Sequence, residues 1–374
     1  MIKKILFVTC TRADYGKLKP LIINVQKNNN FISKVFVSGM HTMKRYGSTY
    51  EELVKDKISG IYRYSNQKKN MRMDEILMNT MKGFSSFLIR IKPDLVIVHG
   101  DRIEPLACAL SSLLNNYLVA HIEGGEVSGT VDEMLRHSIS KIAHLHLVSN
   151  KTAKKRLIQM GENKRYIFDV GSPDVDVILN KKLPKIESAK KRFNIRFDKF
   201  SIAIMHPVTT NIANLKKESE IFFLSLVKSK LNYIIVFPNN DLGSEIILKE
   251  IYKLKSNNKF RIFPSIRFES YLTLLKNSNF IIGNSSSGII EAPYYGITTI
   301  NIGTRQTNRL KTKLIKNISF NEKEIIKTIN QVKNRKITKR KFFGEGNSAK
   351  KIEKLLLSNK IWNVSKQKSF IDLF

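Results

Sequence analysis

The sequence contains little cysteine and no long apolar segment. Cys10 and Cys108 are the two cysteines in 374 residues, which is too few for a disulfide framework or a cysteine-based metal cluster. The first residues, MIKKILFVTC, lack the apolar core and cleavage site of a signal peptide, and no run reaches membrane-spanning length. We therefore expect a cytoplasmic protein that has no membrane partner.

The motifs of common cofactor sites are also missing. No G-x-G-x-x-G follows the apolar run that ends at Thr9, so a nicotinamide dinucleotide site is not expected, and no G-x-x-x-x-G-K-[ST] occurs. The seven histidines show no H-E-x-x-H spacing, and no nucleophile elbow is present. The sequence predicts neither a cofactor nor a metal ion.

Acidic residues are scarce relative to basic ones. Lysine and arginine number 65 against 31 aspartates and glutamates, a formal net charge of +34. Such a charge attracts anions of every kind, nucleic acid included. However, the lysines are spread over predicted helix faces, without the interleaved aromatic residues of a nucleic-acid surface. A solvated, lysine-rich exterior is the simpler interpretation, and we expect no nucleic-acid partner.

What the sequence does contain is a regular alternation of short apolar runs and amphipathic helices. The first half predicts strands at 4–9, 32–38, 94–98, 117–122, 144–149 and 166–171, and helices at 18–27, 74–91, 103–114, 132–143 and 150–160. After a lysine-rich stretch at 181–199, a second block predicts strands at 200–205, 232–237, 260–263, 280–283 and 298–302, with helices at 215–228, 244–255, 268–277 and just after Ser286. A helix at 321–333, a basic connector at 334–341 and a helix at 348–358 follow. This alternation predicts an α/β fold of two doubly wound, Rossmann-like domains that face each other across a cleft.

Two carboxylates follow neighbouring apolar strands. Asp101 comes after DLVIV (94–98), and Glu123 comes directly after YLVAHI (117–122). Ligands of open α/β sheets bind at the carboxyl ends of the strands, so both side chains are expected at one crevice, where they could exchange protons with a substrate. Glu133 ranks below them, because Thr130-Val-Asp132-Glu133 also fits a capping box at the start of a helix.

Other polar segments also follow strands. Asn284-Ser285-Ser286-Ser287-Gly288 ends a strand and opens a helix, which favours a phosphate site, although an ordinary serine cap has the same pattern. Arg12 and Lys17 lie where a dinucleotide fingerprint would stand, which suggests phosphate contact through side chains, although a solvated Arg or Lys is the simpler interpretation of these two residues alone. His206 ends the first strand of the second block and is well placed to contact a ligand.

With these residues, the sequence resembles the hydrolysing UDP-N-acetylglucosamine 2-epimerases of bacterial sialic acid biosynthesis. The resemblance rests on TRADYGKLKP, GDRIEPLA, HIEGGEVSGTVDE, RHSISK, HPVTT, FPNNDLGS, IGNSSSGIIEAP and INIGTRQTNR, in this order. It implies a GT-B fold with the nucleotide in the cleft. The expected parts are a first domain at 1–180, a nucleotide-binding domain at 195–345 and a segment at 346–374 whose helix returns to the first domain.

The resemblance also implies roles for single residues. The expected acid and base groups are Asp101, Glu123 and Asp132, with Glu133 and His206 as further candidates. Contacts to the diphosphate are expected from Arg12, Ser285, Ser286 and Arg305, and a contact to the ribose from Glu291. The remaining substrate-binding candidates are Asp14, Lys17, Arg102, His206 and Asn239.

The resemblance implies a reaction that needs no nicotinamide. UDP leaves carbon 1 while a carboxylate takes the proton from carbon 2, and the resulting 2-acetamidoglucal is then hydrated to N-acetylmannosamine. The expected partner is a UDP-sugar, and the expected assembly is a homodimer or homotetramer. Relatives with similar motifs act on UDP- or GDP-linked 2,4-diacetamido-2,4,6-trideoxyglucose on the way to legionaminic acid, and this alternative stays open. A glycosyltransferase of the same fold is a more distant one.

Overall fold

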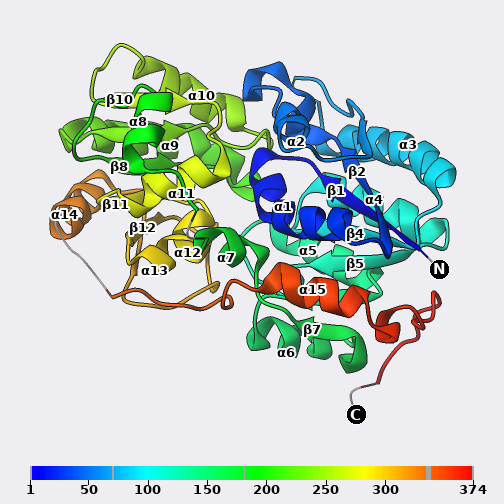
Figure 1. Ribbon diagram of the computed structural model, residues 1–374. Helices are drawn as coiled ribbons and strands as arrows, with labels where there is room; N and C mark the ends of the chain where they lie inside the picture. Colours follow the sequence, from blue (N-terminus) through cyan, green and yellow to red (C-terminus); the bar gives the residue numbers. More distant parts are fainter. Residues whose placement is uncertain (1, 70, 181, 334–337, 373–374) are drawn as a thin grey trace. The chain divides into compact units, whose positions relative to one another are not determined.

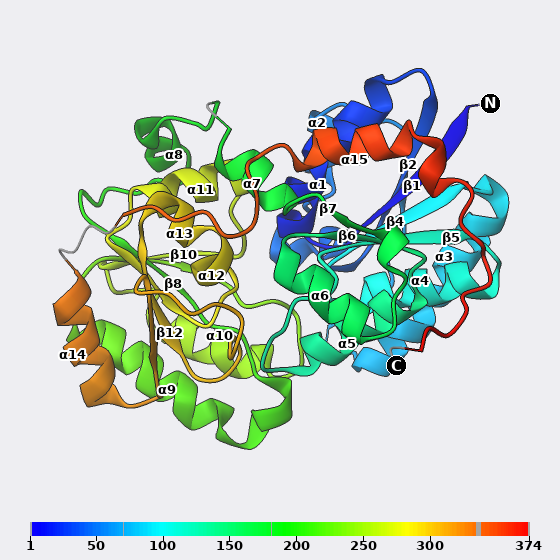
Figure 2. The same ribbon diagram turned by 90° about the horizontal axis from the view of Figure 1, so that it is seen from below.

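The computed structural model describes residues 2–69, 71–180, 182–333 and 338–372. The chain forms two α/β units, each built on its own parallel sheet (Figures 1 and 2). Unit 1 comprises the residues up to Glu126, Asp132–Leu179 and the residues from Phe343 onward; unit 2 comprises Val127–Val131 and Asn180–Phe342. The predicted α/β class is confirmed. In the described part of the chain, no helix is both long and apolar enough to cross a membrane.

The sheet of unit 1 has the strand order β3-β2-β1-β4-β5-β6-β7, and all of its neighbouring strands run parallel. Its strands are β1 Lys3–Thr9, β2 Phe31–Val37, β3 Ile61–Arg63, β4 Leu95–His99, β5 Leu118–Ile122, β6 Leu145–Val148 and β7 Ile167–Asp169. The order reverses between β1 and β4. Ligands of open parallel sheets bind beyond the carboxyl ends of the strands at such a reversal, which directs attention to the segments after Thr9 and His99.

Helices cover both faces of this sheet, because its strands are apolar on both sides. One face packs against α1 Arg12–Lys27, α2 Glu51–Lys55 and α15 Ser348–Leu356. The other packs against α3 Met73–Ile91, α4 Ile103–Leu114 and α5 Val131–Ile142. Two further helices are α6 Lys151–Gln159 and α7 Pro173–Ile178, and short 3₁₀ turns span Gly39–Thr42, Lys44–Tyr46, Lys164–Tyr166 and Asn359–Ile361.

Helix α15 belongs to unit 1 although it follows unit 2 in the sequence. It lies beside α1 in Figures 1 and 2, and Asn28 Nδ2 donates to Glu353 Oε1 at 3.1 Å. The carboxylate of Asp176 accepts from the backbone N–H groups of Ser348 and Ala349 at 2.8 and 2.6 Å. This carboxylate therefore satisfies two of the N–H groups that a helix start leaves without partners.

The sheet of unit 2 has the order β10-β9-β8-β11-β12-β13, again with parallel neighbours. Its strands are β8 Ser201–Ile204, β9 Tyr233–Val236, β10 Phe260–Phe263, β11 Phe280–Gly283, β12 Thr298–Ile302 and β13 Ile315–Ile318. The helices are α8 Ile186–Arg192, α9 Ile212–Lys228, α10 Ser244–Lys253, α11 Phe268–Lys276, α12 Ser287–Ile290, α13 Ala292–Tyr295 and α14 Glu322–Val332, and a 3₁₀ turn spans Thr209–Asn211. Helices α9, α10 and α14 pack on one face, and α11 to α13 lie on the other (Figure 2). The strand order reverses between β8 and β11.

The structure differs from the expected elements in a few places. Helix α1 begins at Arg12, six residues before the expected start, because the Thr11 side chain accepts from Asp14 N and caps the helix there. The edge strands β3 and β13 were not expected, since half-exposed edges lack an apolar run. The stretch expected only to separate the two blocks contains α8. Residues 334–337 of the expected basic connector lie outside the described residues.

Gly283 provides a test of how closely β8 and β11 approach each other, and Gly100, which follows β4 and also has a positive φ, is the control. A Cβ at Gly283, where φ is 127°, would lie 1.9 Å from the carbonyl oxygen of Ile204. At Gly100, where φ is 76°, a Cβ would meet no described atom within 4 Å. Gly100→Ala should therefore lower the free energy of unfolding by about 1 to 2 kcal/mol, the cost of the left-handed backbone alone. Gly283→Ala should lower it by more than about 3 kcal/mol, because the backbone must also move. Urea unfolding checks this, and equal losses would contradict the close approach.

Candidate active site

In unit 1, the carboxyl ends of β1, β4 and β5 carry most of the residues that the sequence singled out. All three strands are buried along their last residues, so the first polar side chains after them gather at one edge of the sheet. Asp101 and Arg102 follow β4, Glu123 follows β5, and Arg12 follows β1. The expected convergence of strand ends is thus present in unit 1.

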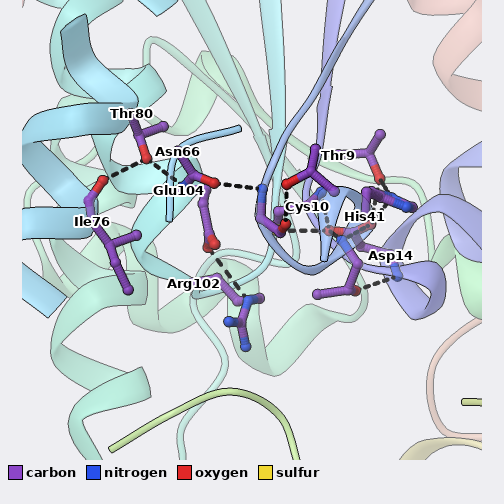
Figure 3. Close-up of polar contacts among 12 residues, drawn as sticks. Thr9, Cys10, Asp14, His41, Asn66, Ile76, Thr80, Arg102 and Glu104 are labelled. Atoms are coloured by element: carbon purple, nitrogen blue, oxygen red, sulfur yellow. Dashed lines mark hydrogen bonds and ion pairs between the residues drawn. The ribbon is translucent and has the colours of Figure 1, made fainter. Parts of the chain in front are cut away.

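The turn after β1 is organised by Asp14 (Figure 3). Its carboxylate accepts from the backbone N–H groups of Cys10 at 2.9 Å and Thr11 at 3.1 Å, and the Thr9 hydroxyl donates to it as well. Although burial raises the pKa of Asp14, the neighbouring His41, the Cys10 thiol and the Thr9 hydroxyl outweigh it and hold that pKa well below its ordinary value. The carboxylate oxygens accept from the chain's own donors, and the expected contact of Asp14 with substrate stays a prediction. Asp14 shapes the turn that presents Arg12.

Each of the three predicted cations of unit 1 is paired with a buried carboxylate. The pairs are Arg12 with Glu52 at 3.2 Å, Arg102 with Glu104 at 3.4 Å and Lys17 with Asp174 at 2.8 Å. Figure 3 shows the Arg102 pair. Glu104 and Asp174 are fully buried, so their charges are stable only beside such cations. None of the three acids is among the site residues expected from the sequence, although an acid inside an apolar helix, as in Ile103–Leu114, is a usable signal.

Glu123 has an unusual backbone. Its φ is +67°, a left-handed conformation that costs a non-glycine residue about 1 to 2 kcal/mol and is concentrated at functional sites. The Ser172 hydroxyl donates to Oε1 at 2.6 Å, and His99 Nε2 lies 3.3 Å from Oε2. Burial raises the pKa of Glu123, but His99 and Lys17 outweigh it, so the pKa is well below its ordinary value. Glu123 is therefore held as a carboxylate.

His99 and Asp174 complete a buried cluster around Glu123. Burial lowers the pKa of His99, but the Glu123 carboxylate outweighs it and the net shift is upward. One donor atom each of His99, Glu123 and Asp174 lies within 4.8 Å of the others, a spacing that a metal ion could use. The Lys17 ammonium already supplies positive charge at Asp174, and the imidazole does so at Glu123. We assign no metal ion here.

Asp101 lies in a second cluster, around Arg136. The guanidinium of this buried arginine donates a hydrogen bond to the Asp101 carboxylate. It also donates to the Glu126 carbonyl at 3.1 Å. Burial lowers the pKa of Arg136, but Asp101 and Asp132 outweigh it and raise that pKa. Arg136 is therefore hydrogen-bonded to one expected catalytic carboxylate, Asp101, and interacts electrostatically with another, Asp132. It was not singled out as a site residue, although it stands in the RHSISK segment.

Glu133 faces a different neighbour. Its Oε1 lies 3.7 Å from His137 Nε2, one turn along α5. The pKa of His137 is lowered, with burial as the main cause. The expected capping box that includes Thr130 stays a prediction, as does the lower rank of Glu133 among the carboxylates.

In unit 2, Asn284 ties together the ends of the two strands at the reversal. Its Oδ1 accepts from His206 N at 2.7 Å, and its Nδ2 donates to the His206 carbonyl at 2.8 Å. The His206 Nδ1 accepts from Asn239 N at 3.1 Å, which leaves the ring proton on Nε2. Three expected site elements of unit 2, namely His206, Asn239 and the serine segment, therefore lie at one end of its sheet.

The serine segment follows Asn284 directly. Ser287 N donates to Ser285 Oγ at 3.3 Å, and Arg305 Nη1 donates to the Asn284 carbonyl at 3.3 Å. The expected helix after Ser286 is divided into α12 and α13, of four residues each. A phosphate would therefore be bound by individual N–H groups and hydroxyls, because so short a helix has only a small dipole. Glu291 is buried at the junction of the two helices.

Comparison with known proteins adds to this geometry. Residues 23–357 match the family model described as UDP-N-acetylglucosamine 2-epimerase. The whole chain is 43% identical to the whole of the UDP-N-acetylglucosamine 2-epimerase of Neisseria meningitidis serogroup B. Over 95% of the chain and 96% of the relative, it is 32% identical to the hydrolysing UDP-N,N'-diacetylbacillosamine 2-epimerase of Legionella pneumophila.

Solved structures show the same fold. The structure of the Methanocaldococcus jannaschii UDP-GlcNAc 2-epimerase in complex with UDP-GlcNAc and UDP matches 94% of the chain and 99% of its own length, with a TM-score of 0.81 and 23% identity. This likeness confirms the expected GT-B class of two Rossmann-like domains.

The histidine next to the two clusters makes stability depend on pH. His121 is fully buried, its Nε2 donates to the Gly100 carbonyl at 2.7 Å, and its Nδ1 accepts from Ser140 Oγ at 3.0 Å. Burial is the main cause that lowers its pKa to about 3. Below pH 6.5 His121 is protonated in the unfolded chain but stays neutral in the folded one. The free energy of unfolding therefore falls as the pH falls, by up to about 1.4 kcal/mol per pH unit.

The variant His121→Gln should remove this contribution. Between pH 6.5 and 5, the free energy of unfolding of the variant should fall less steeply than that of the wild type. The two slopes should differ by close to the value for one bound proton, about 1.4 kcal/mol per pH unit. His137→Gln, which replaces a partly exposed histidine on α5, is the matched control and should change the slope less. Urea titrations at several pH values measure both slopes, and an unchanged slope for His121→Gln would contradict the neutral, buried imidazole.

Proposed function

The chain belongs to the UDP-N-acetylglucosamine 2-epimerase family, and from this premise we propose that it is a hydrolysing epimerase. It converts UDP-N-acetylglucosamine and water to N-acetylmannosamine and UDP through a 2-acetamidoglucal. The observation that carries the proposal is the pair of carboxylates after β4 and β5, Asp101 and Glu123, each beside its own buried cation. We further propose that this reaction, which forms N-acetylmannosamine, is the first step of sialic acid biosynthesis. Its proposed location is the cytoplasm.

The chemistry needs two proton-transferring groups. The proton on carbon 2 of the sugar is not acidic, so its removal must be coupled to departure of UDP from carbon 1. A carboxylate takes this proton, and a second group returns a proton to carbon 2 from the opposite face while water adds to carbon 1. Asp101 and Glu123 are the groups proposed for these steps, with Asp132 near the same arginine as Asp101.

The departing diphosphate gains negative charge and must be stabilised. In unit 2, Ser285, Ser286 and Arg305 are proposed to contact it, and Glu291 to bind the ribose hydroxyls. In unit 1, the proposed diphosphate contact is Arg12, which Glu52 holds in place. His206 can donate from Nε2, because Asn239 N–H occupies Nδ1. Arg102 and Asn239 are proposed to line the substrate site.

A second candidate substrate follows from the relatives. The Legionella relative, 32% identical, is described as a hydrolysing epimerase of UDP-N,N'-diacetylbacillosamine, a 2,4-diacetamido-2,4,6-trideoxy sugar. That substrate differs from UDP-N-acetylglucosamine at carbons 4 and 6, whereas the proposed contacts concern the nucleotide and carbons 1 and 2. The proposal of UDP-N-acetylglucosamine rests on the higher identity, 43%, to the Neisseria relative.

The reaction type can be tested by following the proton on carbon 2. The purified protein should release UDP from UDP-N-acetylglucosamine without added nicotinamide. In deuterium oxide, the N-acetylmannosamine formed should carry deuterium at carbon 2, because the returned proton comes from an exchangeable group. NMR spectroscopy of the product measures this. Product that keeps the original hydrogen would contradict the elimination route.

The substrate can be identified by measuring kcat/KM on each candidate nucleotide sugar side by side. Sites that bind a substrate hydroxyl reject analogues without it by about ten thousandfold, so discrimination at carbon 4 should be sharp. We expect kcat/KM to be at least about a hundredfold higher for UDP-N-acetylglucosamine than for UDP- or GDP-2,4-diacetamido-2,4,6-trideoxyglucose. A preference for either trideoxy sugar would overturn the substrate and leave the reaction type standing.

A further inference from the structure

The partners of the two proposed catalytic carboxylates differ in one chemical respect. Asp101 is bonded to Arg136, a guanidinium that does not release its proton at any working pH. Glu123 lies beside His99, whose imidazole takes up and releases a proton near neutral pH. One carboxylate thus has a permanent cation as its neighbour, and the other has a proton donor.

We propose that His99 supplies the proton that Glu123 delivers to carbon 2, and that Asp101 is the base that removes the original proton. His99 is then a positioning and proton-supplying residue that acts through Glu123. The inference deepens the proposed function and rests on it.

The geometry of the pair supports this transfer. His99 is the last residue of β4 and lies beside Ile122, the last residue of β5, so Glu123 directly follows the residue that pairs with His99. His99 Nε2 lies 3.3 Å from Oε2 of Glu123, and Ser172 holds the other oxygen at 2.6 Å. His99 is 7% exposed and Glu123 is 6% exposed, so solvent reaches the pair only over a small area, through which His99 regains its proton between turnovers.

The charges around His99 favour its protonated form. It faces the carboxylates of Glu123 and Asp174, which raise its pKa, and Lys17, which lowers it. His121 lies near enough to interact with His99 but stays neutral, because burial lowers its own pKa to about 3. The net shift of the His99 pKa is upward despite burial. The surroundings therefore favour the protonated form of His99 next to an ionised Glu123.

The proton balance follows directly. In the elimination, Asp101 takes the hydrogen of carbon 2 as a proton, the C–H electrons form the double bond to carbon 1, and the bond to the diphosphate breaks with its electron pair leaving on UDP. In the hydration, His99 gives a proton to Glu123, Glu123 gives one to carbon 2, and the oxygen of water bonds to carbon 1 and loses a proton to solvent. Asp101 then releases its proton and His99 takes one from solvent, which restores the starting state.

The experiment measures the elimination of UDP and the hydration of the glucal separately, in the variants His99→Gln and Asp101→Asn. Glutamine keeps a polar side chain of similar size beside Glu123 but carries no transferable proton. In His99→Gln, conversion of added 2-acetamidoglucal with UDP to N-acetylmannosamine should fall by about a hundredfold or more. Single-turnover UDP release from UDP-N-acetylglucosamine should change by less than about tenfold, and the glucal should accumulate. Asp101→Asn should show the reverse, with UDP release lost and glucal hydration retained.

His144→Gln is the matched control. His144 directly precedes β6, and its Nδ1 accepts from Val119 N on the neighbouring strand β5. Its replacement should leave the ratio of glucal to N-acetylmannosamine unchanged. Thermal unfolding of each variant accounts for any loss of folded protein. Equal loss of both half-reactions in His99→Gln, or no accumulation of glucal, would overturn the inference. Absence of epimerase activity in the wild type would instead overturn the proposed function.

The pH profile provides a second readout. As the pH rises through the His99 pKa, wild-type enzyme should release more glucal relative to N-acetylmannosamine. Asp174→Asn removes a negative charge that faces His99, so the midpoint of this change should move to lower pH. Asp176→Asn makes the same change two residues along α7, where the carboxylate caps α15, and should leave the midpoint in place. If the pH midpoint of the product ratio is the same in Asp174→Asn as in the wild type, the role of His99 is contradicted.

Discussion

The cost of burying a charge governs the edge of the first sheet. An ion that leaves water loses several kcal/mol of hydration unless an opposite charge and hydrogen bonds replace it. Glu104, Asp174 and Arg136 are all almost completely buried, and each is stable because a partner of opposite sign lies against it. The positions of Arg102, Lys17 and Asp101 follow from these partners. Removing one partner would leave the other uncompensated, so the site behaves as a set of pairs.

This arrangement gives chemically similar side chains different properties. Asp14, Glu123 and Asp174 are all buried carboxylates after strands or at helix starts, yet the pKa values of the first two are lowered and that of the third is raised. The difference lies in their neighbours. Asp14 has backbone donors and a histidine, Glu123 has two cations and a hydroxyl, and for Asp174 the cost of burial exceeds the effect of Lys17.

The sequence was sufficient to predict both parallel sheets and the placement of Asp101 and Glu123, because apolar runs mark buried strands and ligands gather at their carboxyl ends. It did not reveal the partners. Arg136 bonds to Asp101 across 35 positions, and Ser172 bonds to Glu123 across 49, so no local periodicity connects them. The early start of α1 was missed because its cap, Thr11, lies in what reads as a glycine-containing loop. The left-handed backbone of Glu123 has no signal in the residue itself.

The placement of α15 fixes the order in which the protein can assemble during synthesis. Ala349, Ile352 and Leu356 are part of the core that includes α1 and the first strands. Unit 2 is complete in the sequence once residue 342 has been made, whereas unit 1 still lacks one of its covering helices at that point. Domains generally fold as they emerge from the ribosome. The domain that carries Asp101 and Glu123 therefore closes its core last, and the apolar surface under α15 needs protection until the ribosome has released residues 348–356.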